Sequence, residues 1–400
     1  MSEIDDGWGG ASPFDPEFRN DPYPALRRLR EADPVNETPV GIWRLLRYRD
    51  VERLLNDVAC GTRTTDGVLP GVDEAGDGPR QFMLQKDPPD HTRLRKLVSR
   101  AFTPKSLEAW KAAIQRVVDE CLDRVSPTGE ADLIADLALP VPSTIICEML
   151  GVPIADRPRF TQWTAQATLG LAAPILPRDV VEVARAAGLA LGDYFAGLIA
   201  ERRASLRADL LSDLIRAKEA GDRLSSDELL AQAVGLLIAG FETTIGLIAN
   251  GARALIHHPD QLEKLRSHPE LGAKAVQECL RYDGPIILTP RILHEAAEFG
   301  GKRIPKDAMV WAMLSSANRD PQKFPDPDRF DIERDASQHV AFGGGAHFCL
   351  GYRLAELEAR AALTSLVMRC RELRLPSETV EWGISLFRVP GALPVTFRPS

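Results

Sequence analysis

A glycine-rich loop around one cysteine, directly before a predicted helix, restricts the fold of this 400-residue chain more than any other feature. Residues 342–351 read Phe-Gly-Gly-Gly-Ala-His-Phe-Cys-Leu-Gly, with four glycines and Cys349. From Leu350 to Ala361 apolar residues recur every three or four positions, which predicts a helix with one apolar face. Cys349 should therefore stand at a helix amino terminus, where N–H groups and the helix dipole favour a thiolate. Glycines also let the backbone approach a flat ligand closely.

A glycine-rich turn with an incidental buried cysteine is the alternative for this loop. The combined spacing of Phe342, Gly345, Cys349 and Gly351 argues against it. That spacing resembles the haem-ligand loop of the cytochrome P450 family, whose pattern is Phe, two residues, Gly, three residues, Cys, one residue, Gly. The resemblance implies that Cys349 is the thiolate ligand of a haem b iron, which favours O–O cleavage. It also places Phe342, Gly345 and Gly351 around the haem.

Residues 229–256 form a long apolar run that predicts one helix. Glu242 is its only acid, and an acid in so apolar a stretch is costly unless it is solvated or hydrogen-bonded. Thr243 and Thr244 can bond to carbonyls one turn earlier, and Gly240 weakens the same turn, so we expect a local opening of the helix. The alternative is that Glu242 reaches the surface or forms a structural ion pair, and the residues alone leave both open.

The run Ala239-Gly-Phe-Glu-Thr243 resembles the family's oxygen-binding segment, Ala/Gly-Gly-x-Asp/Glu-Thr. The resemblance implies that Thr243 hydrogen-bonds the outer atom of bound oxygen, that Glu242 helps to relay protons to it, and that Ala239 lies against the haem. That outer atom must receive two protons before the O–O bond breaks heterolytically. The intact acid and alcohol disfavour a peroxide-only variant of the family.

The two propionates of a buried haem require cationic partners. Residues 90–100 predict a short basic helix with His91 and Arg95 on one face. Such a helix is often only a solvated surface, but the family's His-x-x-x-Arg signature assigns both residues to the propionates, and similar matching adds Arg291 and His347. The opposite face is expected to dock an acidic ferredoxin and carries Arg93, Lys96 and Arg100.

Glu278 and Arg281 stand three residues apart and therefore share one helical face as a potential ion pair. This spacing is common by chance. It resembles the family's Glu-x-x-Arg motif because it precedes the cysteine loop at a suitable distance. The stretch Phe324-Pro-Asp-Pro-Asp-Arg-Phe330 between them resembles the family's meander, which implies that Arg329 joins this structural network.

Charge and cysteine usage exclude several classes of protein. The chain has 57 acidic and 49 basic side chains, for a net charge of −8, which argues against a nucleic-acid binder. No two of the six cysteines are closer than 21 residues, so neither zinc-ligand pairs nor a small disulfide framework fits. The acidic amino terminus lacks a secretory signal, and the longest uncharged stretch, 160–177, contains polar residues and prolines. We expect a cytoplasmic protein without a membrane span.

The coarse pattern predicts a mainly α (α+β) fold. Helix formers dominate 105–125, 180–235, 260–282 and 350–370, and strand-like pieces occur at 42–46, 286–293, 309–314 and 384–395. No repeat or linker divides the chain, so we expect one domain over 1–400 with residues 1–14 as a flexible tail. The resemblance implies the cytochrome P450 fold, a helical bundle around a buried haem with small β-sheets. Loops at 61–85 and 169–179 are either plain connections or, where a pocket is present, flaps that cover it.

Matching by position also suggests a substrate pocket that is apolar and almost without charge, which predicts a hydrophobic small molecule held by shape. Each of its residues would also fit an ordinary apolar core. The predicted set is Phe82, Met83, Leu84, Gly235, Ile238, Ile287, Leu288, Thr289, Leu386 and Phe387.

These observations together predict a monomeric haem-thiolate monooxygenase that uses O2 and two electrons from a ferredoxin-type donor with an NAD(P)H-dependent reductase. It would hydroxylate or epoxidise a fatty acid, terpenoid, steroid or macrolide-like molecule. The alternatives are a peroxide-driven peroxygenase, which the intact Glu242 and Thr243 disfavour, and a non-catalytic haem-binding sensor, for which no regulatory or DNA-binding segment is seen.

Overall fold

The computed structural model describes residues 8–12, 15–56, 59–68, 82–170, 178–219, 222–377, 379–382 and 387–399. Its α-helices are α1 (Pro16–Asn20), α2 (Tyr23–Ala32), α3 (Tyr48–Asn56), α4 (Asp90–Ser99), α5 (Pro104–Glu108), α6 (Lys111–Val125), α7 (Pro140–Leu150), α8 (Arg157–Thr168), α9 (Arg178–Ala204), α10 (Leu210–Arg216), α11 (Ser226–His257), α12 (Pro259–Ser267), α13 (Gly272–Asp283), α14 (Leu314–Ala317) and α15 (Tyr352–Arg369). Its strands are β1 (Val35–Glu37), β2 (Trp43–Leu45), β3 (Cys60–Gly61), β4 (Glu130–Asp132), β5 (Lys218–Glu219), β6 (Asp222–Arg223), β7 (Thr289–Leu293), β8 (Ala297–Phe299), β9 (Lys302–Ile304), β10 (Met309–Ala312), β11 (Cys370–Arg374) and β12 (Pro394–Pro399).

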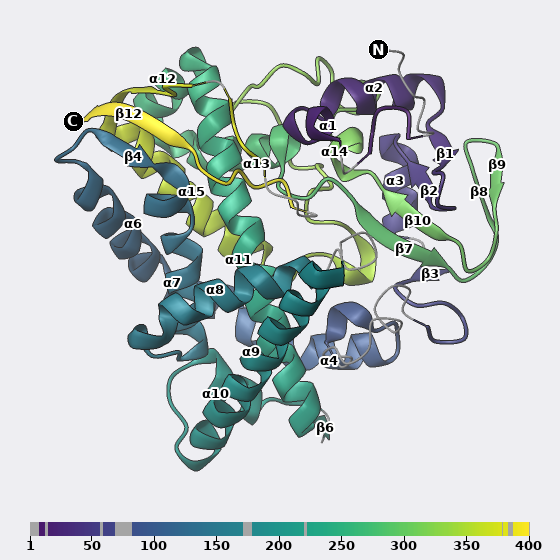
Figure 1. Cartoon of the computed structure of the whole chain (residues 1–400), viewed down its shortest axis with the longest axis horizontal. Coiled ribbons are helices and arrows are strands. Elements are labelled where there is room, and N and C mark those ends of the chain that lie inside the picture. The colour runs from purple at the N-terminus through teal and green to yellow at the C-terminus, as the bar shows by residue number, and fades with distance from the viewer. Residues whose placement is uncertain are drawn as a thin grey trace.

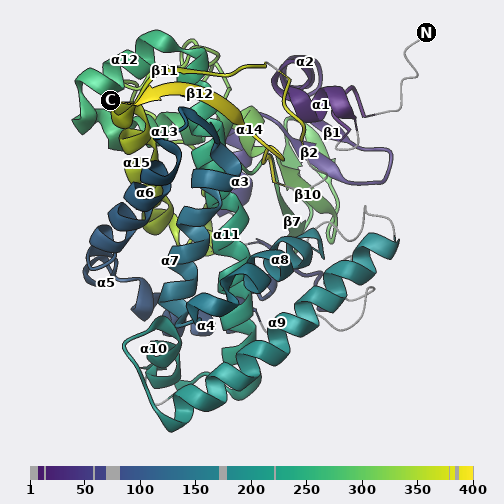
Figure 2. The same ribbon diagram turned by 60° about the vertical axis from the view of Figure 1, so that its left-hand side comes forward.

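Helix α11 is the axis of the helical side of the molecule. A capping box starts it, because Ser225 accepts a hydrogen bond from the N–H of Glu228 while the Glu228 carboxylate accepts one from the Ser225 N–H. The helix is apolar nearly all round, as expected of a buried helix. It packs against α7, α8, α9, α13 and α15, and Figure 2 shows α9 running along the outside of this bundle.

The main sheet lies to one side of the helices together with the amino-terminal segment (Figure 1). Its strand order is β1-β2-β10-β7-β3, and every neighbouring pair is antiparallel except the parallel pair of β2 and β10. A second sheet has the order β11-β12-β4 and joins the carboxyl-terminal strand to the middle of the chain. The largest apolar core lies among the helices, and smaller clusters pack against each side of the main sheet.

Most predicted elements are present, with shifted ends. The region 286–293 forms a strand only from Thr289, and 384–395 is wrong as a strand because β12 begins at Pro394. Before Pro394 the described residues make only isolated bridges, at Trp382, Phe387 and Pro390. The first residue of β12 is a proline, a strand position at which the missing N–H is tolerated. The helical region 260–282 is divided between α12 and α13 at His268.

Two helices in the described part of the chain, α9 and α11, have the length and apolar composition that a membrane span requires. The apolar window of α11 is 72% buried inside the protein, as in the core helix of a globular domain, and that of α9 is 33% buried. All six cysteines lie among the described residues, and none forms a disulfide.

Candidate functional site

The loop around Cys349 is a tight turn that ends just before α15. The Cys349 N–H donates to the Phe342 carbonyl at 3.0 Å, and Gly343 and Gly345 have φ angles of +70° and +63°. A Cβ on Gly345 would lie 2.2 Å from the Leu55 carbonyl oxygen, so position 345 requires glycine for both backbone conformation and space. The glycines of the loop therefore let the chain around Cys349 turn back on α3.

Burial raises the pKa of the Cys349 thiol to about 11, while the Gly351 N–H and the Arg95 guanidinium act in the opposite direction. The Gly351 N–H favours the thiolate as expected, but without a metal ion the effect of burial is larger. Helix α15 starts only at Tyr352, and the loss of water around the sulfur outweighs the nearby N–H groups. A coordinated metal ion would deprotonate such a thiol outright, because its charge replaces the missing solvation.

A cluster named here the cation cluster, after its two guanidiniums, contains three predicted propionate partners: His91, Arg95 and Arg291. His91 and Arg291 are 2% and 5% exposed. Arg95 donates through Nη2 to the Phe348 carbonyl at 2.6 Å, next to Cys349. Arg291 donates to the Pro290 carbonyl at 2.8 Å and to Thr289 Oγ1 at 3.3 Å. Within the described chain, neither guanidinium has a carboxylate partner.

The electrostatics of this cluster indicate a missing anion. Burial and the charges of His347 and Arg95 lower the pKa of His91 to about 4, and burial lowers the pKa of Arg291. The His91 and His347 rings lie 4.2 Å apart, and the buried Nδ1 of His91 has no hydrogen-bond partner among the described residues. Buried cations without anions are costly, so an incoming dicarboxylate would be strongly stabilised here. The propionates of a haem fit this requirement.

His347 has a partner that the sequence analysis missed. Its Nε2 lies 3.7 Å from Asp87 Oδ1, and Asp87 also accepts hydrogen bonds from the N–H groups of Thr62 and Arg63 at 2.8 and 3.0 Å. Asp87 thus joins β3 and the loop after it to the cysteine loop. An Asp in a Pro-rich stretch before a helix gives no sequence signal for such a contact.

Open space borders α11 at its centre. Residues 231–237 and 244–252 are all buried, whereas Ala239 is exposed and Ile238, Glu242 and Thr243 are half-buried. The Thr243 and Thr244 hydroxyls donate to the carbonyls of Ala239 and Gly240 at 3.0 and 3.3 Å. These bonds form as expected, but α11 continues without a break, so the predicted local opening is wrong. A long core helix that is exposed at its middle, and not only at its two ends, is consistent with a large ligand lying against Ala239 and Thr243.

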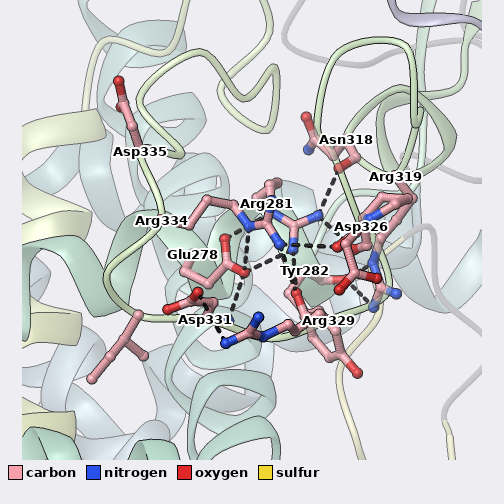
Figure 3. Close-up of polar contacts among 12 residues, drawn as sticks. Glu278, Arg281, Tyr282, Asn318, Arg319, Asp326, Arg329, Asp331, Arg334 and Asp335 are labelled. Atoms are coloured by element: carbon pink, nitrogen blue, oxygen red, sulfur yellow. Dashed lines mark hydrogen bonds and ion pairs between the residues drawn. The ribbon is translucent and has the colours of Figure 1, made fainter.

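Glu278 and Arg281 form a fully buried bidentate pair at 2.7 Å, and both side chains are 0% exposed (Figure 3). Arg281 also donates to the carbonyls of Asn318, Pro327 and Arg329 at 3.1, 2.8 and 3.1 Å. Every nitrogen of the Arg281 guanidinium therefore has an acceptor, either Glu278 or a backbone carbonyl. The pair connects α13 to this segment and is balanced within the protein.

The side chain of Arg329 does not join this network. It is 62% exposed and lies 3.6 Å from Asp331, while only its carbonyl reaches Arg281. The side chain that does reach Glu278 belongs to Arg334, whose Nε is 3.3 Å from Glu278 Oε1 (Figure 3). Glu278, Arg281 and Arg334 form the ion-pair network of this protein. Sequence spacing could not distinguish the two arginines because the irregular chain between them sets their directions.

The expected basic docking face is smaller than predicted. Arg93 forms ion pairs with Glu228 and, at 3.2 Å, with Asp222, so its charge is balanced and it ties α4 to the start of α11. Lys96 and Arg100 are exposed on α4 and just after it.

The predicted pocket residues are only partly brought together. The Phe82 ring lies flat on Gly235, where a Cβ would be 2.3 Å from the ring, and the Met83 N–H donates to Gln232 Oε1 at 3.2 Å. Leu84 is 45% exposed and turns away from this contact. Ile287 and Leu288 pack beside the cluster of Trp311, with Thr289 half-buried at the start of β7, and Phe387 pairs with Ile286 in an isolated bridge. Leu386 lies outside the described residues.

Comparison with known proteins agrees with this geometry. Residues 45–382 match the cytochrome P450 family. The chain is 42% identical to the cytochrome P450 monooxygenase PikC of Streptomyces venezuelae, over 96% of this chain and 92% of that protein. It is 40% identical to the vitamin D(3) 25-hydroxylase of Pseudonocardia autotrophica, over 96% of each.

A solved structure, the myxobacterial cytochrome P450 CYP267B1 in complex with myristic acid, superposes with a TM-score of 0.87 at 39% identity, covering 97% of this chain and 99% of that one. The chain belongs to the cytochrome P450 family and has its mainly α fold. It is a cytochrome P450 monooxygenase, an oxidoreductase.

Proposed function

We propose that this protein binds haem b through the Cys349 thiolate, with its propionates held by His91, Arg95, Arg291 and His347. The observation that carries the proposal is the cluster of His91, Arg95 and Arg291 beside the Cys349 loop. In the described chain neither guanidinium pairs with a carboxylate, and the buried Nδ1 of His91 has no hydrogen-bond partner. Phe342, Gly345 and Gly351 shape the sulfur side, and Ala239 forms the opposite surface.

When bound, a thiolate-ligated haem supplies reductive activation of O2 and transfer of one oxygen atom. The residues of the protein position the reacting groups and supply protons. The Thr243 hydroxyl donates to the Ala239 carbonyl, and its oxygen keeps the capacity to accept a hydrogen bond from a group in the open space beside α11. Glu242, one residue earlier and half-buried, connects that hydroxyl to more polar surroundings and acts as the proton relay.

The substrate that we propose is a hydrophobic small molecule, hydroxylated or epoxidised in a pocket between Phe82, Gly235 and the Phe387 segment. Named ligands and activities of similar proteins, vitamin D3 and myristic acid, support an apolar substrate. We also propose that the protein is a cytoplasmic monomer and a single domain. Its electrons come from a ferredoxin-type donor with an NAD(P)H-dependent reductase, docking near Lys96 and Arg100.

A carbon monoxide spectrum of the reduced protein tests the haem ligand. We expect a Soret band at about 450 nm, the signature of thiolate ligation, and its loss in Cys349→Ser. Cys279→Ser is the matched control, because Cys279 is also buried and burial raises its thiol pKa, yet it lies in α13. A wild-type band at about 420 nm in freshly folded protein would refute the assignment of Cys349.

Two neighbouring threonines test the oxygen site. Both hydroxyls bond back to carbonyls of α11, but Thr244 is 3% exposed and Thr243 borders the open space. We expect Thr243→Ala to lower product formed per NAD(P)H by about 10²-fold, the usual share of a positioned proton-transfer group, with the excess reducing power released as hydrogen peroxide. Thr244→Ala should leave this ratio nearly unchanged. Equal effects of the two changes would refute the role of Thr243.

A further inference from the structure

The segment that carries Phe387 is attached to the protein by a buried ion pair that neither the cation cluster nor the ion-pair network uses. Arg388 Nε lies 2.7 Å from Asp283 Oδ1, and the two side chains are 3% and 7% exposed. The Tyr23 hydroxyl donates to the same carboxylate oxygen at 2.7 Å. Asp283 is the last residue of α13, so the pair fixes the 387–389 segment to the end of that helix.

Arg388 uses its remaining donors on the amino-terminal segment. It donates to the carbonyls of Arg19 and, at 2.9 Å, Asn20. Its guanidinium also lies 3.8 Å from the centre of the Trp382 ring. The side chain therefore has one fixed orientation, since every contact would be lost together if it moved.

Helix α11 holds the backbone of the same segment directly. The Asn250 amide donates to the carbonyls of Arg388 and Asp283 at 2.9 and 3.2 Å. A Cβ on Gly246 would lie 3.1 Å from the Arg388 carbonyl oxygen and 2.7 Å from Pro285 Cβ. Position 246 is therefore a glycine because the segment lies against the helix there.

These contacts lie on the face of α11 that carries Thr243. Asn250 follows Thr243 by seven residues, which is about two helical turns and roughly 10 Å along the axis, and Gly246 lies between them. The Arg388 N–H donates to the Pro285 carbonyl at 2.7 Å, and Phe387 pairs with Ile286. The half-buried Phe387 thus belongs to a segment that is held against α11 one to two turns from Thr243.

We propose that the Asp283–Arg388 pair and Asn250 are positioning residues that hold Phe387 against the distal side of the haem pocket and so determine how a bulky ligand lies near the iron. This inference rests on the proposed haem and substrate site. It predicts that loosening these contacts changes the recognition of ligand shape while haem binding and thiolate ligation stay intact.

Two azoles of different size test the proposal on the haem-loaded protein. Imidazole requires only access to the iron, whereas the phenyl group of 4-phenylimidazole must also fit the surrounding pocket. We expect Arg388→Lys to weaken 4-phenylimidazole by about tenfold, because displacement of a positioned group by about 1 Å can cost up to about a hundredfold. Binding of imidazole should stay within about twofold, which is the spread of an uncoupled site. Asn250→Ser should act in the same direction and serves if Arg388→Lys does not yield haem protein.

Arg202→Lys is the matched control. Arg202 and Asp209 form an equally buried pair at 2.6 Å, with side chains 1% and 6% exposed, where α9 meets α10. Figure 1 shows α10 at the bottom of the view and α1 and α13 at the top. An unchanged ratio of the two azole affinities in Arg388→Lys or Asn250→Ser would overturn the inference, as would an equal change in Arg202→Lys. If the wild-type protein lacks both the band at about 450 nm and a response to imidazole, the proposed haem site itself fails instead.

Discussion

The ion-pair network around Glu278 and the cation cluster around His91 are both buried, but only in the network does a carboxylate pair directly with a guanidinium. Beside the cluster, Asp87 pairs with His347 and acts on Arg291 only through its charge. Glu278 and Arg281 satisfy each other at 2.7 Å, and the remaining Arg281 donors reach backbone carbonyls. Arg291 is 5% exposed and, among the described residues, donates only to a carbonyl and a hydroxyl. A balanced network stabilises the fold, whereas an unbalanced cluster is a binding site whose anion arrives with a ligand.

The largest expected effect on stability comes from a change in the ion-pair network. Glu278→Gln leaves the Arg281 guanidinium buried without its counter-ion, so the free energy of unfolding should fall by about 3–5 kcal/mol. Urea unfolding followed by circular dichroism measures this loss. Glu270→Gln is the control, because the Glu270 side chain is 69% exposed and should tolerate the change. Similar unfolding midpoints for Glu278→Gln and the wild type would remove the contrast between the two regions.

In the cation cluster the same kind of change should have opposite effects on the apoprotein and the haem-loaded protein. Arg291→Leu removes a buried cation that forms no ion pair in the described chain. Burial outweighs the attraction of Asp87 and lowers the pKa of Arg291, so the apoprotein should be at least as stable as the wild type. Loss of a charge-assisted hydrogen bond should weaken haem retention by about 1.5–3 kcal/mol, or roughly 10- to 100-fold.

Haem transfer to an excess of a scavenging globin, together with urea unfolding of the apoprotein, separates the two effects of Arg291→Leu. If the apoprotein loses as much stability as Glu278→Gln, then Arg291 has a structural role and the cluster is not a site for an anion.

Acidification should lower the stability of the apoprotein more than that of the haem-loaded protein. Because burial lowers the pKa of His91 from 6.5 to about 4, neutral His91 stabilises the apoprotein fully above pH 6.5, and this contribution is lost as the pH falls toward 4. A bound propionate would favour the protonated ring, so the holoprotein should lose less stability over the same range.

Unfolding of the apoprotein and holoprotein at pH 7 and pH 5 measures this difference. His91→Gln should reduce the pH dependence of the apoprotein without abolishing it, because burial also lowers the pKa of His339 and His347. An apoprotein with the same stability at both pH values would contradict the assignment.

The smallest expected effect on stability concerns Arg329 in the meander and Arg334 just after it. Arg334→Ala removes a cation that is 14% exposed and bonded to Glu278 and to the carbonyls of Pro325 and Asp326, so we expect a loss of about 1–2 kcal/mol. Arg329→Ala should stay within about 0.5 kcal/mol because its side chain is mainly solvated. Thermal unfolding of both variants measures the order of the two effects, and the reverse order would restore Arg329 to the network.

Much of the site could be predicted because its chemistry depends on short, regular spacing. Glu278 and Arg281 meet because they are three residues apart on a helix, and His91 and Arg95 share a face of α4 for a similar reason. Contacts between residues distant in the sequence were the source of most errors. The direction of Arg329, the exposure of Leu84, the pairing of Arg93 and the late start of β12 all depend on neighbours distant in the sequence.

The sequence by itself determined the helical character, the glycine positions that a tight loop around Cys349 requires, and the residue types that can ligate iron and bind carboxylates. Only the tertiary structure decided which charges are balanced. Asp87 reaches His347, Arg334 reaches Glu278, and Arg388 reaches Asp283 across 105 positions. The physical reason is that the energy of a buried charge depends on its neighbours in space and on the loss of water, and local spacing encodes neither.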